Sequence, residues 1–151
     1  MAAKYLQVIF SVMLFIFPSA SFVFAKFSIP GYVYSAGQLS SARSVAKSSN
    51  KPIAFVMSDR NTDCGLATAA SKDLFQGLQN HSVVVYAEHK DWQSLPDVVK
   101  GGLSSAESGK FIPKTVVVDS RCKNIICIIP YAETKQRQQL IQQAVQLLSS
   151  Y

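Results

Sequence analysis

Three cysteines, Cys64, Cys122 and Cys127, are the residues of this chain best suited to covalent chemistry. A thiolate attacks disulfides and binds soft metals, and two neighbouring thiols form a disulfide under oxidising conditions. Because three is an odd number, at least one cysteine has no partner within the chain. Which chemistry is open to each cysteine depends on the helix, strand or turn that positions it.

Cys122 and Cys127 flank the start of an apolar run, Ile125–Ile129. A Cys122–Cys127 disulfide is left open, although the offset between the two residues is awkward across a tight turn. Cys127, between isoleucines, is expected in the core. A metal site that joins these two cysteines to His81 or His89 would have no recognised ligand spacing. We therefore predict no metal and no cofactor.

Residues 1–25 have the three parts of a secretory signal peptide. Lys4 supplies the basic start, residues 6–17 are almost entirely apolar, and residues 23–25 offer small side chains at the cleavage positions. The apolar run is shorter than the roughly 20 residues of a membrane-spanning helix. We expect a single mature domain, residues 26–151, that is secreted or periplasmic and has no stable membrane insertion after cleavage.

The charge pattern argues against nucleic acid as a partner. The 151-residue chain carries 15 basic and 9 acidic residues, and its formal net charge is +6. The basic residues are scattered, with no basic run, zinc-finger spacing or glycine-rich phosphate loop. The positive charge favours solubility or a weak attraction to acidic surfaces.

Apolar runs alternate with segments of helical periodicity along the mature chain. Continuous apolar runs predict strands covered on both faces, and helices between strands predict parallel crossovers. The short polar turn led by Asp119 predicts an antiparallel last pair of strands. Strands are expected at 53–57, 82–88, 115–118 and 125–129; helices at 37–50, 64–80 and 133–150, with a shorter one capped by Ser94 and stopped by Gly101-Gly102. The fold class predicted is α/β, with a four- to five-stranded mixed sheet and helices on both faces.

Ile112-Pro113 precedes one of these strands. Proline at the first position of a strand costs no ladder hydrogen bond, because proline has no amide hydrogen. Only X-Pro bonds adopt the cis form at low cost, and a cis bond here would leave backbone groups open to a passing peptide. Ile112 and Pro113 are therefore candidate peptide-binding residues.

The order and spacing of these features resemble the thioredoxin-like superfamily over nearly the whole mature chain. The resemblance rests on the helix leading into residues 51–56, the Ser58-Asp59 strand end, Cys64 at a helix start, and Ile112-Pro113 before a strand. A hairpin and a terminal amphipathic helix complete it. It implies a cis Pro113 that faces the active-site motif.

The resemblance also implies two cysteines, separated by two residues, at the start of the second helix. This chain has one cysteine there, so its sequence can be aligned with the two-cysteine motif in two ways, which we call registers. In Cys64-Gly65-Leu66-Ala67, Cys64 is the nucleophile and Ala67 replaces the resolving cysteine. In Asn61-Thr62-Asp63-Cys64, Cys64 takes the resolving position. Counting from the neighbouring strands favours the second register, and both lack a complete dithiol.

Two functions follow as expectations. We favour a redox-inactive module of the cell envelope that binds or assembles other envelope proteins or peptides. The alternative is a monothiol thiol-disulfide oxidoreductase that uses Cys64, with Ile112 and Pro113 presenting the substrate backbone. Trp92, the single tryptophan, either anchors its loop or lines a peptide groove, and we favour anchoring.

Overall fold

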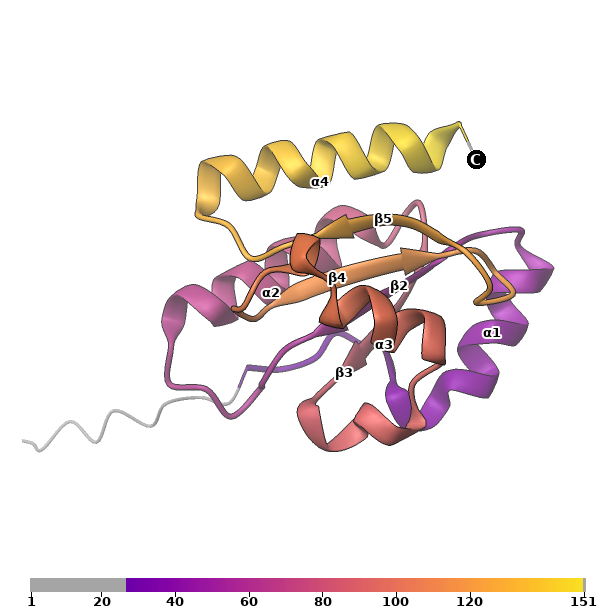
Figure 1. Ribbon diagram of the computed structural model, residues 1–151, viewed down its shortest axis with the longest axis horizontal. Helices are drawn as coiled ribbons and strands as arrows, with labels where there is room; N and C mark the ends of the chain where they lie inside the picture. Colours follow the sequence, from indigo (N-terminus) through magenta and orange to yellow (C-terminus); the bar gives the residue numbers. More distant parts are fainter. Residues whose placement is uncertain (1–26, 151) are drawn as a thin grey trace, which may run out of the picture.

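A five-stranded mixed β-sheet, in the strand order β1-β3-β2-β4-β5, organises the chain in the computed structural model (Figure 1). β1 and β2 run parallel to β3, whereas β4 is antiparallel to both β2 and β5. The structure describes residues 27–150, so the predicted signal peptide, residues 1–25, lies outside the described residues. The strands are β1 (Tyr34–Ser35), β2 (Ile53–Met57), β3 (Val83–Ala87), β4 (Lys114–Val118) and β5 (Ile125–Ile129).

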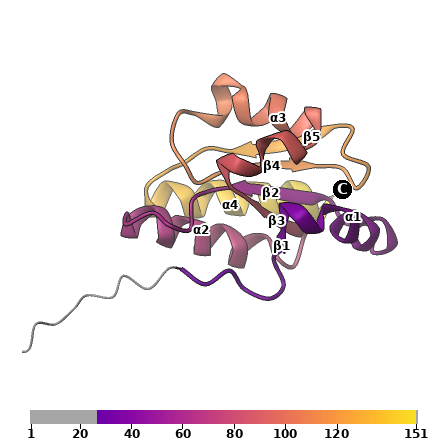
Figure 2. The ribbon, with the colours of Figure 1, turned by 90° about the horizontal axis from the view of Figure 1, so that it is seen from below.

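Helices cover both faces of this sheet. Figure 2 shows α3 on one face and α2 with α4 on the other. The helices are α1 (Leu39–Ser48), α2 (Gly65–Leu78), α3 (Asp97–Ser104) and α4 (Thr134–Ser149), with short 3-10 turns at Ala36–Gln38, His89–Ser94 and Ala106–Ser108. The predicted α/β class, with a mixed sheet and helices on both faces, is confirmed. The arrangement is consistent with a thioredoxin-like architecture.

Two hydrophobic clusters, one on each face, form the core. Alternate residues of β2 enter different clusters, because successive strand side chains point to opposite faces. Ala54 and Val56 pack with residues of α2 and α4. Ile53 and Phe55 pack with residues of α1 and α3. This double burial explains why β2 is apolar at every position.

α3 corrects one prediction of the sequence analysis. The helix begins at Asp97, after Pro96, and not at a cap formed by Ser94, whose hydroxyl donates to the Asp91 carbonyl. Gly101 and Gly102 lie inside the helix and do not stop it. A Cβ at Gly102 would come within 2.9 Å of Val116, so glycine allows α3 to lie close against β4.

The two ends of the sheet carry different loops. At one end, Met57 of β2 pairs with Ala87 and Lys114, and we call this the site end. The segment before α2, the segment before β4 and the start of α4 all meet there, at the left of Figure 1. At the other end, Ile53 pairs with Val83 and Val118, and we call this the hairpin end because the β4–β5 turn lies there.

Candidate functional site

Cys64 lies at the site end, as the N-cap residue of α2. Its thiol is free and exposed. Its amide donates to Thr62 Oγ1 at 3.1 Å, and its carbonyl accepts from the Thr68 amide, also at 3.1 Å. The backbone at Cys64 is therefore fixed on both sides while the sulfur faces solvent.

The helix start separates the two predicted registers. Ala67 lies buried in the first turn of α2, whereas Asn61 lies three residues before the N-cap, in the loop. The Asn61 amide donates to Asp59 Oδ1 at 2.8 Å, which closes a turn before the helix. This geometry favours the register Cys64-Gly65-Leu66-Ala67, with Cys64 at the helix N-terminus and Ala67 in the position of the resolving cysteine. Counting along the sequence had favoured the other register.

Ile112 and Pro113 lie at the same end of the sheet, and the bond between them is cis. They precede the Met57–Lys114 pair, so their backbone groups lie outside the ladder of β2 and β4. The Phe111 side chain is 71% exposed and that of Ile112 is 38% exposed. The Phe111 ring meets the Tyr131 ring edge-on, with 6.2 Å between centroids. Phe111 and Ile112 therefore expose apolar side chains to solvent next to Pro113.

Leu66, 68% exposed in the first turn of α2, extends this surface. Leu66 and Tyr131 line one open cavity of about 610 Å³ between the starts of α2 and α4. Tyr131 in turn touches Phe111, which precedes Ile112. We call Leu66, Phe111, Ile112 and Tyr131 the apolar surface. It joins residues from three separate segments of the chain at the site end.

A second cavity, of about 410 Å³, lies beside the apolar surface, and we call it the Trp92 cavity. Ile112 is part of the apolar surface and also lines the Trp92 cavity. Trp92 lines this cavity and also packs against the core cluster under α1 and α3. The single tryptophan therefore packs against the core, as the anchoring role predicts, and also lines a cavity.

Cys122 and Cys127 do not form the disulfide that the sequence left open, and both carry free thiols. The side chains lie on opposite faces of the sheet, because Cys122 packs against the cluster under α1 and α3 and Cys127 against the cluster under α2 and α4. Burial raises the pKa of Cys127 to about 11 and also raises the pKa of Cys122. Cys122 lies in the turn at the hairpin end, at the opposite end of the sheet from Cys64, and Cys127 lies within β5, opposite Val117 of β4.

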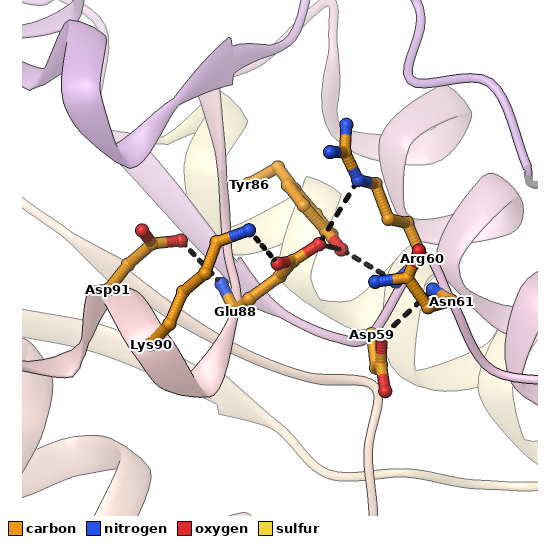
Figure 3. Close-up of polar contacts among 7 residues, drawn as sticks. All are labelled: Asp59, Arg60, Asn61, Tyr86, Glu88, Lys90 and Asp91. Carbon is orange, nitrogen blue, oxygen red and sulfur yellow. Dashed lines mark hydrogen bonds and ion pairs between the residues drawn. The ribbon is translucent and has the colours of Figure 1, made fainter.

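A hydrogen-bonded network holds the segment that precedes Cys64 (Figure 3). The Arg60 amide donates to the Tyr86 hydroxyl at 2.8 Å, and that hydroxyl donates to Glu88 Oε1 at 2.9 Å. The side chains of Arg60 and Lys90 form ion pairs with the same carboxylate. Burial and the Glu88 hydrogen bond raise the pKa of Tyr86, so its hydroxyl keeps its proton at neutral pH. The network therefore fixes the loop at Arg60 through a phenol held by a buried carboxylate.

Glu88 was missed by the sequence analysis. Its burial alone raises its pKa, but hydrogen bonds from Lys90 and Tyr86 and the charges of Lys90 and Arg60 outweigh burial, and the net shift is downward. The available signal was an acidic residue directly after the apolar strand Val83–Ala87. Tyr86 and Lys90 are close to it along the chain, but Arg60 is brought to it only by the fold.

Among residues 27–150, no group of three or more histidine, cysteine, aspartate or glutamate side chains is placed to hold a metal ion. Within the same residues, no helix is long and apolar enough to cross a membrane. Searches of protein-family models, curated proteins and solved structures found no match to this chain. Fold and site define an α/β protein with an exposed thiol at a helix N-terminus and an apolar surface beside it.

Proposed function

We propose that this chain is a redox-inactive, thioredoxin-like module that binds extended segments of other polypeptides at its apolar surface. One observation carries the proposal: Leu66 and the adjacent pair Phe111 and Ile112 are exposed at one end of the sheet although they come from two separate segments. Exposed apolar groups that gather in one place mark interaction sites. The backbone at Ile112 lies outside the ladder, next to these side chains, where an extended segment would lie.

The absence of a second cysteine near Cys64 supports binding over dithiol chemistry. Ala67 occupies the position that a resolving thiol would need in the register favoured by the helix start, and alanine has no group to attack a mixed disulfide. Cys122 lies in the turn at the hairpin end, and Cys127 is partly buried within β5 against the cluster under α2 and α4. The proposed setting is the cell envelope, and it rests on the signal peptide predicted from residues 1–25.

A monothiol oxidoreductase is the second candidate, and the exposure of Cys64 at the N-cap of α2 favours it. The Cys64 thiolate would attack one sulfur of a partner disulfide and form a new S–S bond, and the other sulfur would leave as a thiolate. A second thiol, such as glutathione, would then attack the mixed disulfide and release Cys64. The missing resolving thiol would thus come from another molecule.

An array of 12-residue unstructured peptides, probed with the domain of residues 26–151, tests the binding function. We expect a subset of apolar-rich peptides to be retained. Leu66→Ser with Phe111→Ser should weaken binding to these peptides at least tenfold. The matched control is Val45→Ser with Leu147→Ser, which removes two apolar side chains that are exposed on α1 and α4, away from the site end.

Two results would overturn the proposal. One is an array on which the wild-type domain retains no peptide. The other is a Leu66→Ser, Phe111→Ser variant that binds as the wild type does. Turnover of a peptide disulfide in the presence of glutathione, lost in Cys64→Ser, would instead establish the monothiol function.

A further inference from the structure

The Trp92 cavity borders the proposed peptide-binding surface and differs from it in charge. Its apolar walls include Met57 and Leu103, and its volume of about 410 Å³ lies in the range of about 300–1,000 Å³ typical of small-ligand sites. Ile112 lies on the boundary between cavity and apolar surface. A polypeptide that crosses Ile112 would therefore bring a side chain to the mouth of the cavity.

Two lysines give the cavity a positive charge that no carboxylate neutralises by direct contact. Lys114 Nζ donates to three neutral oxygens: Leu103 O at 2.7 Å, Gly109 O at 3.1 Å and Ser108 Oγ at 3.2 Å. Those bonds fix the ammonium group in a half-buried position but leave its charge uncompensated. Lys110, the second lysine of the lining, is exposed, and neither amine forms an ion pair with the described residues.

Hydrogen-bond donors accompany this charge. Trp92 and His89 line the cavity, and neither ring nitrogen is hydrogen-bonded to another group within residues 27–150. Tryptophan has a donor and no acceptor, and lysine likewise only donates. The opposing group is Asp59, a single carboxylate in the lining, one of whose oxygens accepts from the Asn61 amide. The lining therefore holds two lysine charges against one carboxylate charge.

We propose that the Trp92 cavity binds an acidic side chain, aspartate or glutamate, of the polypeptide that lies across the apolar surface. The carboxylate would meet Lys110 and the field of Lys114, and its methylene groups would contact Met57 and Leu103. Charge pairs in half-buried sites are screened less than those in open solvent, so the cavity favours a charged over a neutral side chain. The inference rests on the proposed function and names the chemical class of the segment bound.

A matched pair of labelled peptides tests this selectivity by fluorescence anisotropy. Each is an apolar ten-residue peptide, identical except for glutamate or glutamine at one central position. We expect the wild-type domain to bind the glutamate peptide about fivefold more tightly at low salt, which corresponds to about 1 kcal/mol. The preference should fall in 0.5 M NaCl because salt screens the charges.

Three variants make the test specific. Lys110→Gln should reduce the preference for glutamate to less than twofold. Asp59→Asn keeps an oxygen acceptor for the Asn61 amide and removes the negative charge, so it should increase the preference severalfold. Lys123→Gln, in the turn at the hairpin end, removes the same charge elsewhere and should leave the preference unchanged. Equal binding of both peptides, or equal effects of Lys110→Gln and Lys123→Gln, would overturn the inference.

A second measurement separates failure of this inference from failure of the proposed function. Trp92 is the only tryptophan, so intrinsic fluorescence reports directly on the cavity. N-acetyl-glutamate N-methylamide should change the Trp92 emission saturably, the glutamine analogue should not, and Lys110→Gln should abolish the change. If no peptide binds but this titration succeeds, the cavity inference stands and the peptide function fails. If the glutamate and glutamine peptides bind equally well and neither analogue changes the Trp92 emission, the peptide-binding function stands and the cavity inference fails.

Discussion

The two ends of the sheet both use a buried carboxylate to hold a loop, but they use it in different ways. Asp119 at the hairpin end and Glu88 at the site end are each 7% exposed. Asp119 accepts from the amides of Arg121, Lys123 and Asn124 at 2.9–3.1 Å and from the Asn124 side chain at 2.7 Å. All its partners lie within five residues, so the hairpin turn holds itself.

Glu88, by contrast, joins two segments, because two of its partners lie within two residues of it and the third lies in the loop before α2. Its partners are the Tyr86 hydroxyl, Lys90 and, across the loop before α2, Arg60. The hairpin turn is held mainly by Asp119, with one distant contact in which the Arg43 side chain donates to the Arg121 carbonyl at 3.3 Å, and one large apolar side chain, Ile125, is exposed there. The site end instead gathers the exposed side chains of Leu66, Phe111 and Ile112. This difference agrees with the proposal that the site end serves recognition.

Asp119→Ala is expected to have the largest effect on stability. The substitution leaves three backbone amides and one side-chain amide without their acceptor, and hydrogen bonds to a charged group contribute about 1.5–3 kcal/mol each when measured singly. We expect the free energy of unfolding to fall by about 3 kcal/mol, measured by urea denaturation, and peptide binding to stay unchanged. Asp97→Ala, which removes a fully exposed carboxylate paired with Lys100, should leave the free energy of unfolding close to that of the wild type. Equal costs at both positions would contradict the comparison.

Tyr86→Phe should have a smaller and more local effect. It removes the hydroxyl that accepts from the Arg60 amide and donates to Glu88, while the ring keeps its packing against Phe27 and Phe75. We expect a loss of about 1.5 kcal/mol in the free energy of unfolding. Hydrogen exchange at the Arg60 amide should accelerate, while exchange at the Lys123 amide should keep its rate. A uniform change at both ends would show that Tyr86 acts only through global stability.

Acid should destabilise both ends, since the pKa of each carboxyl is lowered in the folded protein. Burial of Asp119 raises its pKa, but the hydrogen bonds that it accepts from Lys123, Asn124 and Arg121 outweigh burial. Burial of Glu88 likewise raises its pKa, but Lys90, Tyr86 and Arg60 outweigh burial. An unfolded chain then binds more protons than the folded one in acid, so stability is full above the ordinary carboxyl pKa and is lost as pH falls toward the folded pKa. Urea denaturation from pH 7 to pH 3 should show a shallower acid loss in Asp119→Asn and in Glu88→Gln. If the free energy of unfolding falls with pH as steeply in both variants as in the wild type, these assignments are wrong.

The same contrast explains what the sequence could predict. The bounds of β2 and β5 were predicted to the residue, because each is an unbroken apolar run between a proline and a polar residue. Burial on two faces accounts for the run in β2, whereas β5 is only partly buried. The Asp119 turn was also recognised, since its hydrogen bonds are local. β1 was missed, because a strand of two residues, Tyr34–Ser35, leaves no periodicity to detect.

Features that depend on distant contacts could not be predicted. Arg137 is buried and its guanidinium donates to Asp73 on α2 and to the Ala132 carbonyl, 64 and 5 residues away. An arginine at a position of the apolar stripe of α4 was the available signal, in helical spacing with Ile141. Gly102 was misread for the same reason, because its purpose is a close approach to Val116 that only the fold reveals. The Glu88 network and the Trp92 cavity likewise combine segments far apart in sequence.

Cys64→Ser carries the smallest expected change and separates the two functions proposed for the site end. Serine at an N-cap position is at least as favourable as cysteine, so the free energy of unfolding should shift by less than about 0.5 kcal/mol. Because Cys64 is exposed and is not part of the apolar surface, affinity for apolar peptides should remain within twofold of the wild type. In the wild type, iodoacetamide should label Cys64 in the folded state and Cys127 only after unfolding, as peptide mass spectrometry would show. A Cys64→Ser variant that loses peptide affinity under oxidising conditions, but not with excess reductant, would mean that the surface retains its partners through a mixed disulfide rather than through apolar contact.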